Sequence, residues 1–187
     1  TLKNFTSSQA VTFNGEVNLA GEVALQSECV FNDSLIISED CTSLSQSGVT
    51  VKGDLFLNGG SISGLGAVNL RGNFSANTDS PVINNLQLCG LQSQIIDSNS
   101  ELTVNTLVNN HKSVGGVTFD CTVYVTESLD NNVIPACKNG KNIILTGDAV
   151  VIGNKINTSV SAKDWNMNSD LEIKGTLYAA GNINLLS

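Results

Sequence analysis

Residues 11–37 read VTFNGEVNLAGEVALQSECVFNDSLII, with apolar residues in pairs two positions apart, once every six residues. The unit is Φ-x-Φ-x-G-x, where Φ is an apolar residue. Alternation over three residues places the first and third positions on one face of a short strand and the second on the other. The fifth position must then turn, which glycine tolerates best because it lacks a Cβ. Such a unit predicts neither a helix nor an ordinary hairpin sheet.

The unit recurs along most of the chain, in 15 clean or near-clean copies. They start at Val11, Val17, Val23, Cys29, Leu35, Val49, Leu55, Val68, Val117, Val123, Ile143, Ala149, Leu171, Leu177 and Ile183. Nine of the 17 glycines occupy a fifth position: Gly15, Gly21, Gly53, Gly59, Gly72, Gly147, Gly153, Gly175 and Gly181. Three six-residue sides make a coil of about 18 residues, and stacked coils pair as parallel strands about 4.8 Å apart. We therefore predict an all-β, single-domain parallel β-helix (a β-solenoid) over residues 1–187, with about nine three-sided coils.

Breaks in the repeat indicate where the coil changes. The hexad is lost at residues 42–48, 76–85, 89–101, 105–116, 126–142 and 154–170. We expect 126–142 and 154–170 to be side loops, because they contain Pro135 and the only tryptophan, Trp165. Both inward positions are often large, as at Leu55 and Leu57, and two large residues need a roomy coil. That need favours a right-handed solenoid.

Composition limits the partners. The chain has 17 Asp and Glu against 9 Lys and Arg, of which only Arg71 is arginine. Nucleic acid and anionic membranes attract clustered positive charge, so we expect no nucleic-acid partner. No apolar run approaches the roughly 18 residues that span a bilayer, so we expect no membrane insertion by this segment. The chain does not begin with Met and ends in register with the repeat, so we expect it to be part of a longer chain.

The five cysteines allow two interpretations. Cys29 and Cys41 occupy first positions two units apart, so we expect them to point inward, as small core residues or as a cross-link. Cys121 and Cys137 could close the segment 126–142 as a disulfide, which would leave Cys89 unpaired. The chain has no CxxC motif and one histidine, which argues against a zinc site.

Four Asn-x-Ser/Thr sequons are candidates for glycosylation if the protein is secreted. They lie at Asn4, Asn32, Asn73 and Asn157.

The residue pattern of two stretches resembles that of repetitive surface-exposed β-solenoids. The stretches are KGDLFLNGG (52–60) and SDLEIKGTLYAAGNINLLS (169–187). Proteins of this kind include autotransporter passenger domains and viral or phage fibre segments, and bactofilin-like filaments look similar. The resemblance covers most of the chain and is one of architecture, without a family motif. It implies an extracellular location, at a cell or virion surface, and a structural role.

No group of residues points to catalysis, and we predict that the chain is not an enzyme, with no catalytic, cofactor-binding or metal-binding residue and no cofactor. Hexapeptide-repeat acyltransferases use a histidine as general base, but we interpret His111 in NNHKSVGG as a polar loop residue. Polysaccharide lyases and glycosidases need paired carboxylates or calcium-binding Asp clusters. The acids here are scattered, and adjacent Glu39 and Asp40 would point to opposite faces of a strand.

Several apolar residues occupy second positions, where the side chain should point outward. These interaction-surface candidates are Val30, Ile36, Phe56, Tyr124, Ile144 and Tyr178, to which we add Trp165. Contiguous exposed apolar surface marks an interface or a face that loops cover. The partners we expect are a protein or glycan on another surface, or further domains or subunits of the same assembly.

Our leading hypothesis is a non-catalytic extracellular structural or adhesive module, such as a surface adhesin, fibre or coat segment. Its loops would contact protein or glycan. One alternative is a β-helix that binds or degrades polysaccharide. A second alternative is a self-assembling filament protein.

Overall fold

The computed structural model shows an all-β chain built from the short strands β1–β27. It describes residues 1–99, 101–113, 116–131, 136–138 and 140–146, and beyond 146 only the strand backbone between 150 and 185. In this described part no helix is long and apolar enough to cross a membrane.

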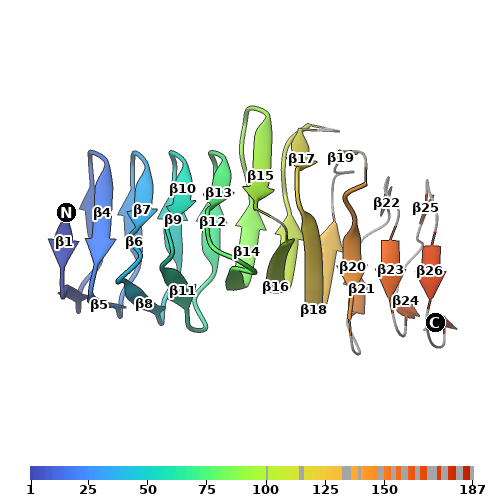
Figure 1. The fold of residues 1–187 in the computed structure, drawn as a ribbon, viewed down its shortest axis with the longest axis horizontal. Helices are drawn as coiled ribbons and strands as arrows, with labels where there is room; N and C mark the ends of the chain where they lie inside the picture. Colours follow the sequence, from blue (N-terminus) through green and yellow to red (C-terminus); the bar gives the residue numbers. More distant parts are fainter. Residues whose placement is uncertain are drawn as a thin grey trace.

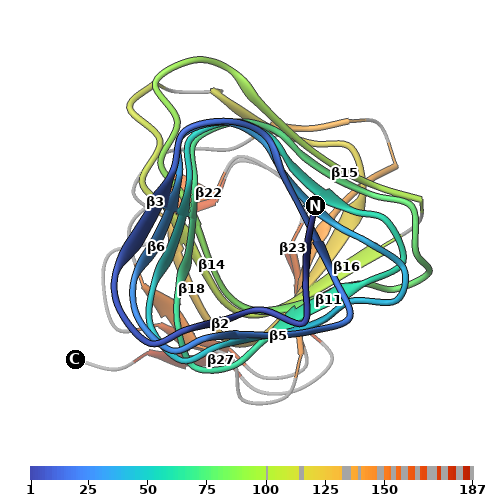
Figure 2. The same ribbon diagram turned by 90° about the vertical axis from the view of Figure 1, so that its left-hand side faces the viewer.

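The strands stack as three parallel faces around one core (Figures 1 and 2). The first face is an 8-stranded sheet of β1 (Leu2–Lys3), β4 (Val17–Ala20), β7 (Leu35–Ile37), β10 (Leu55–Leu57), β13 (Phe74–Ala76), β15 (Gln94–Ser98), β17 (Val117–Phe119) and β19 (Ala136–Cys137). A two-stranded sheet of β22 (Lys155–Ile156) and β25 (Glu172–Ile173) is separate.

A 17-stranded sheet wraps around the other two faces. The second face holds β2 (Thr6–Ser7), β5 (Glu22–Leu25), β8 (Thr42–Ser45), β11 (Ser61–Ser63), β20 (Ile143–Leu145), β23 (Val160–Ala162) and β26 (Leu177–Ala179). The third face holds β3 (Val11–Phe13), β6 (Cys29–Phe31), β9 (Val49–Val51), β12 (Val68–Leu70), β21 (Val150–Ile152), β24 (Trp165–Met167) and β27 (Ile183–Leu185). Three long strands, β14 (Val82–Leu88), β16 (Glu101–Asn109) and β18 (Thr122–Asn131), cross both faces.

The coil is right-handed, as the large inward residues predict. Seen from the N-terminal end, the chain runs clockwise from β2 to β3 as it recedes (Figure 2). The eight strands of the first face, β1 to β19, make about seven turns, slightly fewer than the nine coils expected, and β20–β27 continue the stack beyond β18. The turns are unequal, because 18 residues separate the paired Leu19 and Ile37 but 23 separate Ile96 and Phe119.

The first and third positions of the repeat fill the core, as predicted. On β10, Leu55 and Leu57 are fully buried, while Phe56 between them is half-buried on the outside. The parallel register places Leu55 between Leu35 and Phe74 in one interior column. Burial of such side chains is the main force that holds stacked coils together.

Aromatic residues pack at the N-terminal end of the core. Phe13 stacks on Phe31 with ring centroids 4.9 Å apart, and Phe5 meets Phe13 edge-on at 6.1 Å. Offset stacking and edge-to-face contacts are the favoured geometries of aromatic pairs.

The prediction of side loops at 126–142 and 154–170 is wrong for part of each segment. Residues up to Asn131 belong to β18, which pairs with β16 and β21, and β19 pairs with β17. The strands β22, β23 and β24 occupy much of 154–170. In β18 the hexad fails because a long strand replaces short strands and glycine bends, and the pairing of β16 with β18 shifts register between Val104 and Thr106.

The alternation on β10 can be tested with two neighbouring residues. Leu55→Ala is expected to lower the free energy of unfolding by about 2–5 kcal/mol, because it leaves a cavity in the core. Phe56→Ala removes a larger side chain but should cost about 1 kcal/mol or less, because that side chain lies outside. Urea denaturation of both variants measures the difference. A larger loss for Phe56→Ala would contradict the inward position of Leu55.

Candidate functional site

The corner between the third and first faces changes shape along the stack. It is a three-residue turn at residues 52–54, between β9 and β10, and again at 71–73, between β12 and β13. It widens to residues 89–93 between β14 and β15, and to 110–116 between β16 and β17. The wider turns project beyond the outline of the earlier coils (Figures 1 and 2). The repeat is broken in the sequence at these two places.

The step from narrow to wide turns leaves a hollow of about 430 Å³, which we call the corner groove. It is lined by Lys52, Gly53, Asp54, Arg71, Gly72, Asn73, Leu91, Gln92 and Ser93. The two narrow turns form its floor, and residues 91–93 of the first wide turn form its wall. A Cβ on Gly72 would lie 2.3 Å from the carbonyl oxygen of Gly53, so the turns pack more closely than any other residue allows.

A buried glutamine fastens the wall to the floor. The side chain of Gln94 is only 1% exposed. Its Nε2 donates hydrogen bonds to the carbonyl oxygens of Gly72 at 2.6 Å and Leu70 at 3.2 Å. Its Oε1 accepts from the backbone N–H of Gly90 at 2.8 Å. All its bonds go to backbone, so Gln94 replaces the ladder bonds that the widened turn cannot make.

Two polar side chains on the floor are held in place in the same way. The Oδ1 of Asp54 accepts from the backbone N–H of Asn73 at 2.7 Å. The Oδ1 of Asn73 in turn accepts from the backbone N–H of Ile95 at 2.9 Å. Each side chain therefore bonds to the next coil, and the floor has a defined shape.

His111 supports the wall from the following wide turn. It lies in a loop as predicted, but it is 2% exposed rather than solvated. Its Nδ1 accepts from the backbone N–H of Ser113 at 3.0 Å, so its Nε2 carries the proton and donates to the carbonyl oxygen of Gln92 at 2.7 Å. Both ring nitrogens are bonded to backbone, which identifies a structural histidine rather than a general base.

Two cations flank the groove floor, Lys52 and Arg71, and both are exposed. Over the described residues the one ion pair joins Lys138 and Asp120, so neither cation of the groove is paired. Arg71 also lies beside Cys89; burial raises the pKa of that thiol, and the guanidinium partly opposes the effect. This arrangement suits the binding of an anionic group.

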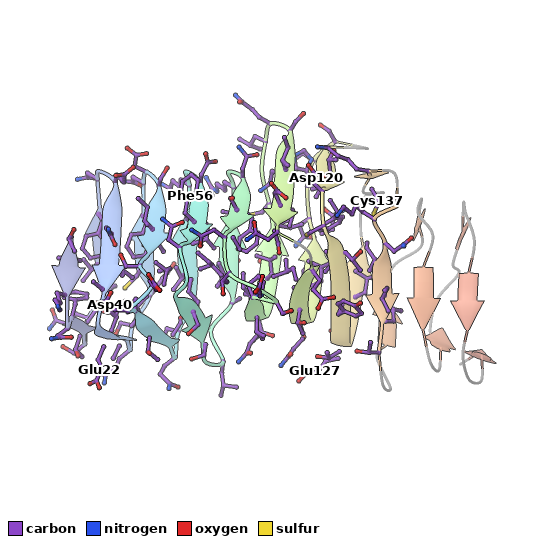
Figure 3. All side chains as sticks on the ribbon, in the orientation of Figure 1. Glu22, Asp40, Phe56, Asp120, Glu127 and Cys137 are labelled. Atoms are coloured by element: carbon purple, nitrogen blue, oxygen red, sulfur yellow. The ribbon has the colours of Figure 1, made fainter. Side chains whose placement is uncertain are left out.

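The groove lacks the arrangement that acid–base hydrolysis needs. Asp54 is the one carboxylate among its lining residues. Elsewhere, Glu39 and Asp79 line a separate hollow, Asp40 is exposed in the turn after β7, and Figure 3 shows Glu127 many coils away from Asp40. Within the described part of the chain, no three His, Cys, Asp or Glu side chains are grouped so that they could hold a metal ion.

The cysteine cross-links proposed from the sequence are not formed, and none of the five cysteines is in a disulfide. Cys29 lies in an interior column between Val11 and Val49, and Cys41 is buried at the corner before β8. They therefore act as small core residues. Cys121 is also buried, whereas Cys137 on β19 is partly exposed.

The predicted interaction-surface residues that the structure describes point outward but do not form one surface. Ile36 pairs with Phe56 on the first face, and Tyr124 pairs with Ile144 on the second. Val30 lies on the third face, next to polar Thr12 and Thr50. The side chains of Trp165 and Tyr178 are outside the described residues.

The sequons fall in different surroundings. Asn4 and Asn32 are exposed, and the Nδ2 of Asn32 donates to Asn14 at 2.7 Å. Asn73 lines the corner groove, so a glycan there would fill it. Asn157 lies outside the described residues.

Sequence reasoning did not identify the corner groove, and none of the predicted interaction or disulfide residues lines it. Two signals were present: Arg71 is the only arginine, and the hexad is lost at residues 89–101. The sequence does not show the register of strand pairing between coils. This register stacks residues 52–54, 71–73 and 89–93 at one corner.

Comparisons with known proteins reveal no relative, since no family model, curated protein or solved structure matches the chain. Function must therefore be inferred from the geometry of the molecule itself.

The role of His111 can be tested through the glycine beside it. A Cβ on Gly116 would lie 2.0 Å from the Cε1 of His111, so Gly116→Ala should displace the ring and cost about 1–3 kcal/mol of stability. Gly15→Ala is the matched control: a Cβ there meets no atom within 4 Å, and the change should be below about 1 kcal/mol. Thermal unfolding compares the two. Equal effects would mean that the ring does not fill this space.

Cys121 gives a prediction for alkaline pH. Burial, with smaller contributions from acids such as Asp97, raises the pKa of Cys121 from 9.0 to about 12. Between these values the unfolded thiol ionises while the folded one keeps its proton, so folded chains bind more protons and stability falls as pH rises. The stability of wild type relative to Cys121→Ala should therefore decrease between about pH 8 and pH 11, measured by urea denaturation at each pH. A constant difference would contradict burial of this thiol.

Proposed function

We propose that the chain is a non-catalytic structural or adhesive module of an extracellular surface. The observation that carries this proposal is the corner groove, a fixed polar surface with unpaired cations and a single carboxylate. Such a groove suits binding, and its one carboxylate does not suit the paired-acid chemistry of glycoside hydrolysis. The solenoid gives this groove a long, rigid support.

The surface composition supports the same role. Charged residues make up only 14% of the chain, and the second positions of the 15 units hold six Asn or Thr, eight apolar residues and one Glu. Ile36 and Phe56 form one apolar pair and Tyr124 and Ile144 another, on different faces. Separate small apolar pairs suit contacts with more than one neighbour, as in a fibre, coat or adhesin.

Three of the five thiols are protected in a way that is compatible with an extracellular location. Cys29, Cys41 and Cys121 are buried, so oxidants have little access to them. Burial also raises the pKa of Cys41, which keeps its thiol in the less reactive protonated form.

A turnover assay tests the proposal. The purified chain, incubated with a panel of neutral and acidic polysaccharides, should release no reducing ends and no unsaturated products. Affinity electrophoresis on the same panel should show retardation by at least one polymer, and Asp54→Asn should remain folded and retarded. Turnover that a single Asp or Glu substitution abolishes would overturn the proposal in favour of a polysaccharide-degrading enzyme.

A further inference from the structure

The two cations of the corner groove lie next to each other in the stack. The backbone N–H of Lys52 bonds to Phe31, and that of Arg71 bonds to Val51, so both residues leave the third face at the same point in consecutive coils. Coils are about 4.8 Å apart, and like charges at such neighbouring positions repel. Their proximity makes this part of the surface locally positive, which favours an anion between the two side chains.

Neighbouring acids form no ion pair with these two cations in the described part of the chain. The chain has 17 Asp and Glu and a net charge of −8, yet neither cation forms an ion pair with a described residue. The carboxylate of Asp54 also lines the groove, but its Oδ1 accepts the backbone N–H of Asn73. Two adjacent cations without an ion-pair partner, in an acidic protein, indicate a site for an external anion.

The groove has the size and lining of a ligand site. Its volume of about 430 Å³ lies within the usual range of roughly 300–1,000 Å³. Gln92 and Ser93 are exposed on its wall and can bond hydroxyl groups, and Leu91, 72% exposed, offers an apolar surface beside them. Buried Gln94 and His111 fix the backbone of that wall, so little ordering is required when a ligand binds.

We propose that the corner groove binds an acidic saccharide through Arg71 and Lys52. The guanidinium of Arg71 can take a carboxylate or sulfate group through two hydrogen bonds, and Lys52 can take the acid of the next sugar unit. Asn73, Gln92 and Ser93 bond sugar hydroxyls, and Leu91 covers the apolar face of a ring. This inference rests on the proposed function and names the ligand class of its groove.

An acidic peptide fits the site less well. Peptides bind solenoid sheets most readily by adding a strand to a free edge, through backbone hydrogen bonds. The strands beside the groove offer no such edge, because β10 and β13 are each paired on both sides. A hydroxyl-rich ligand instead matches the amide and hydroxyl groups on the wall.

Isothermal titration calorimetry with the whole chain tests the inference. The protein is produced in bacteria so that Asn73 carries no glycan, and it is titrated with four probes. Oligogalacturonate supplies carboxylates, heparin oligosaccharide supplies sulfates, and cello-oligosaccharide and poly-glutamate peptide are the neutral and peptide controls. At least one acidic oligosaccharide should bind, more weakly as salt increases, because screening acts on exposed charges.

Variants locate the binding. Arg71→Gln and Lys52→Gln should each weaken binding by about tenfold or more, the effect of losing one charge-assisted hydrogen-bonded contact. Leu91→Asp should weaken it further by adding a negative charge to the wall. Lys3→Gln, which removes an exposed lysine on β1 outside the groove lining, is the matched control and should leave affinity unchanged. All four side chains are exposed, so unchanged thermal unfolding is expected to confirm that each variant folds.

Several outcomes would overturn the inference. These are no binding of either acidic oligosaccharide, equal binding of the neutral one, tighter binding of poly-glutamate, or equal losses for Lys3→Gln and Arg71→Gln. If none of the acidic probes binds but other polymers still retard the chain without turnover, the inference fails and the proposed function stands. If a polymer is cleaved, the proposed function fails instead.

Discussion

Parallel stacking of successive coils is the constraint on which the rest of the structure depends. Each strand bonds to the strand one coil before and one coil after, so side chains at equivalent positions lie in columns, as Leu35, Leu55 and Phe74 do. Apolar columns inside exclude water along the whole length of the stack, and this burial offsets the entropy of ordering many short strands. The same geometry also brings equivalent corner residues together, which is why a single corner can build a site from three coils.

The corners limit how far coils can vary. At Gly72 a side chain would meet the turn of the preceding coil, so narrow turns stack only with glycine at this position. A wider turn loses some backbone partners, and buried side chains must replace them. Gln94 and His111 do so in consecutive coils, each bonded to backbone of the coil before. A step between narrow and wide turns thus requires buried polar residues, and the hollow beside it has a fixed shape.

The period of the sequence was enough to predict the architecture and the inward and outward positions, and the size of the inward residues favoured a right-handed coil. It was not enough where long strands replace the glycine bend, as in β18, because alternation continues there without a turn residue. The corner groove depends on register across about 40 residues, from Lys52 to Ser93, and no local pattern carries that information. Outward apolar residues such as Phe56 were correctly placed, but their division among three faces also follows from register.

Electrostatics gives the corner groove its distinct character. In most of the described chain exposed charges are sparse, and a single ion pair links Lys138 to Asp120. Stacking places Lys52 and Arg71 one coil apart without a carboxylate partner, although acids outnumber bases. The corner also carries Asp54, but its Oδ1 accepts the backbone N–H of Asn73. Lys52 and Arg71 are exposed and have no ion-pair partner among the described residues, so both can meet a ligand from outside the protein.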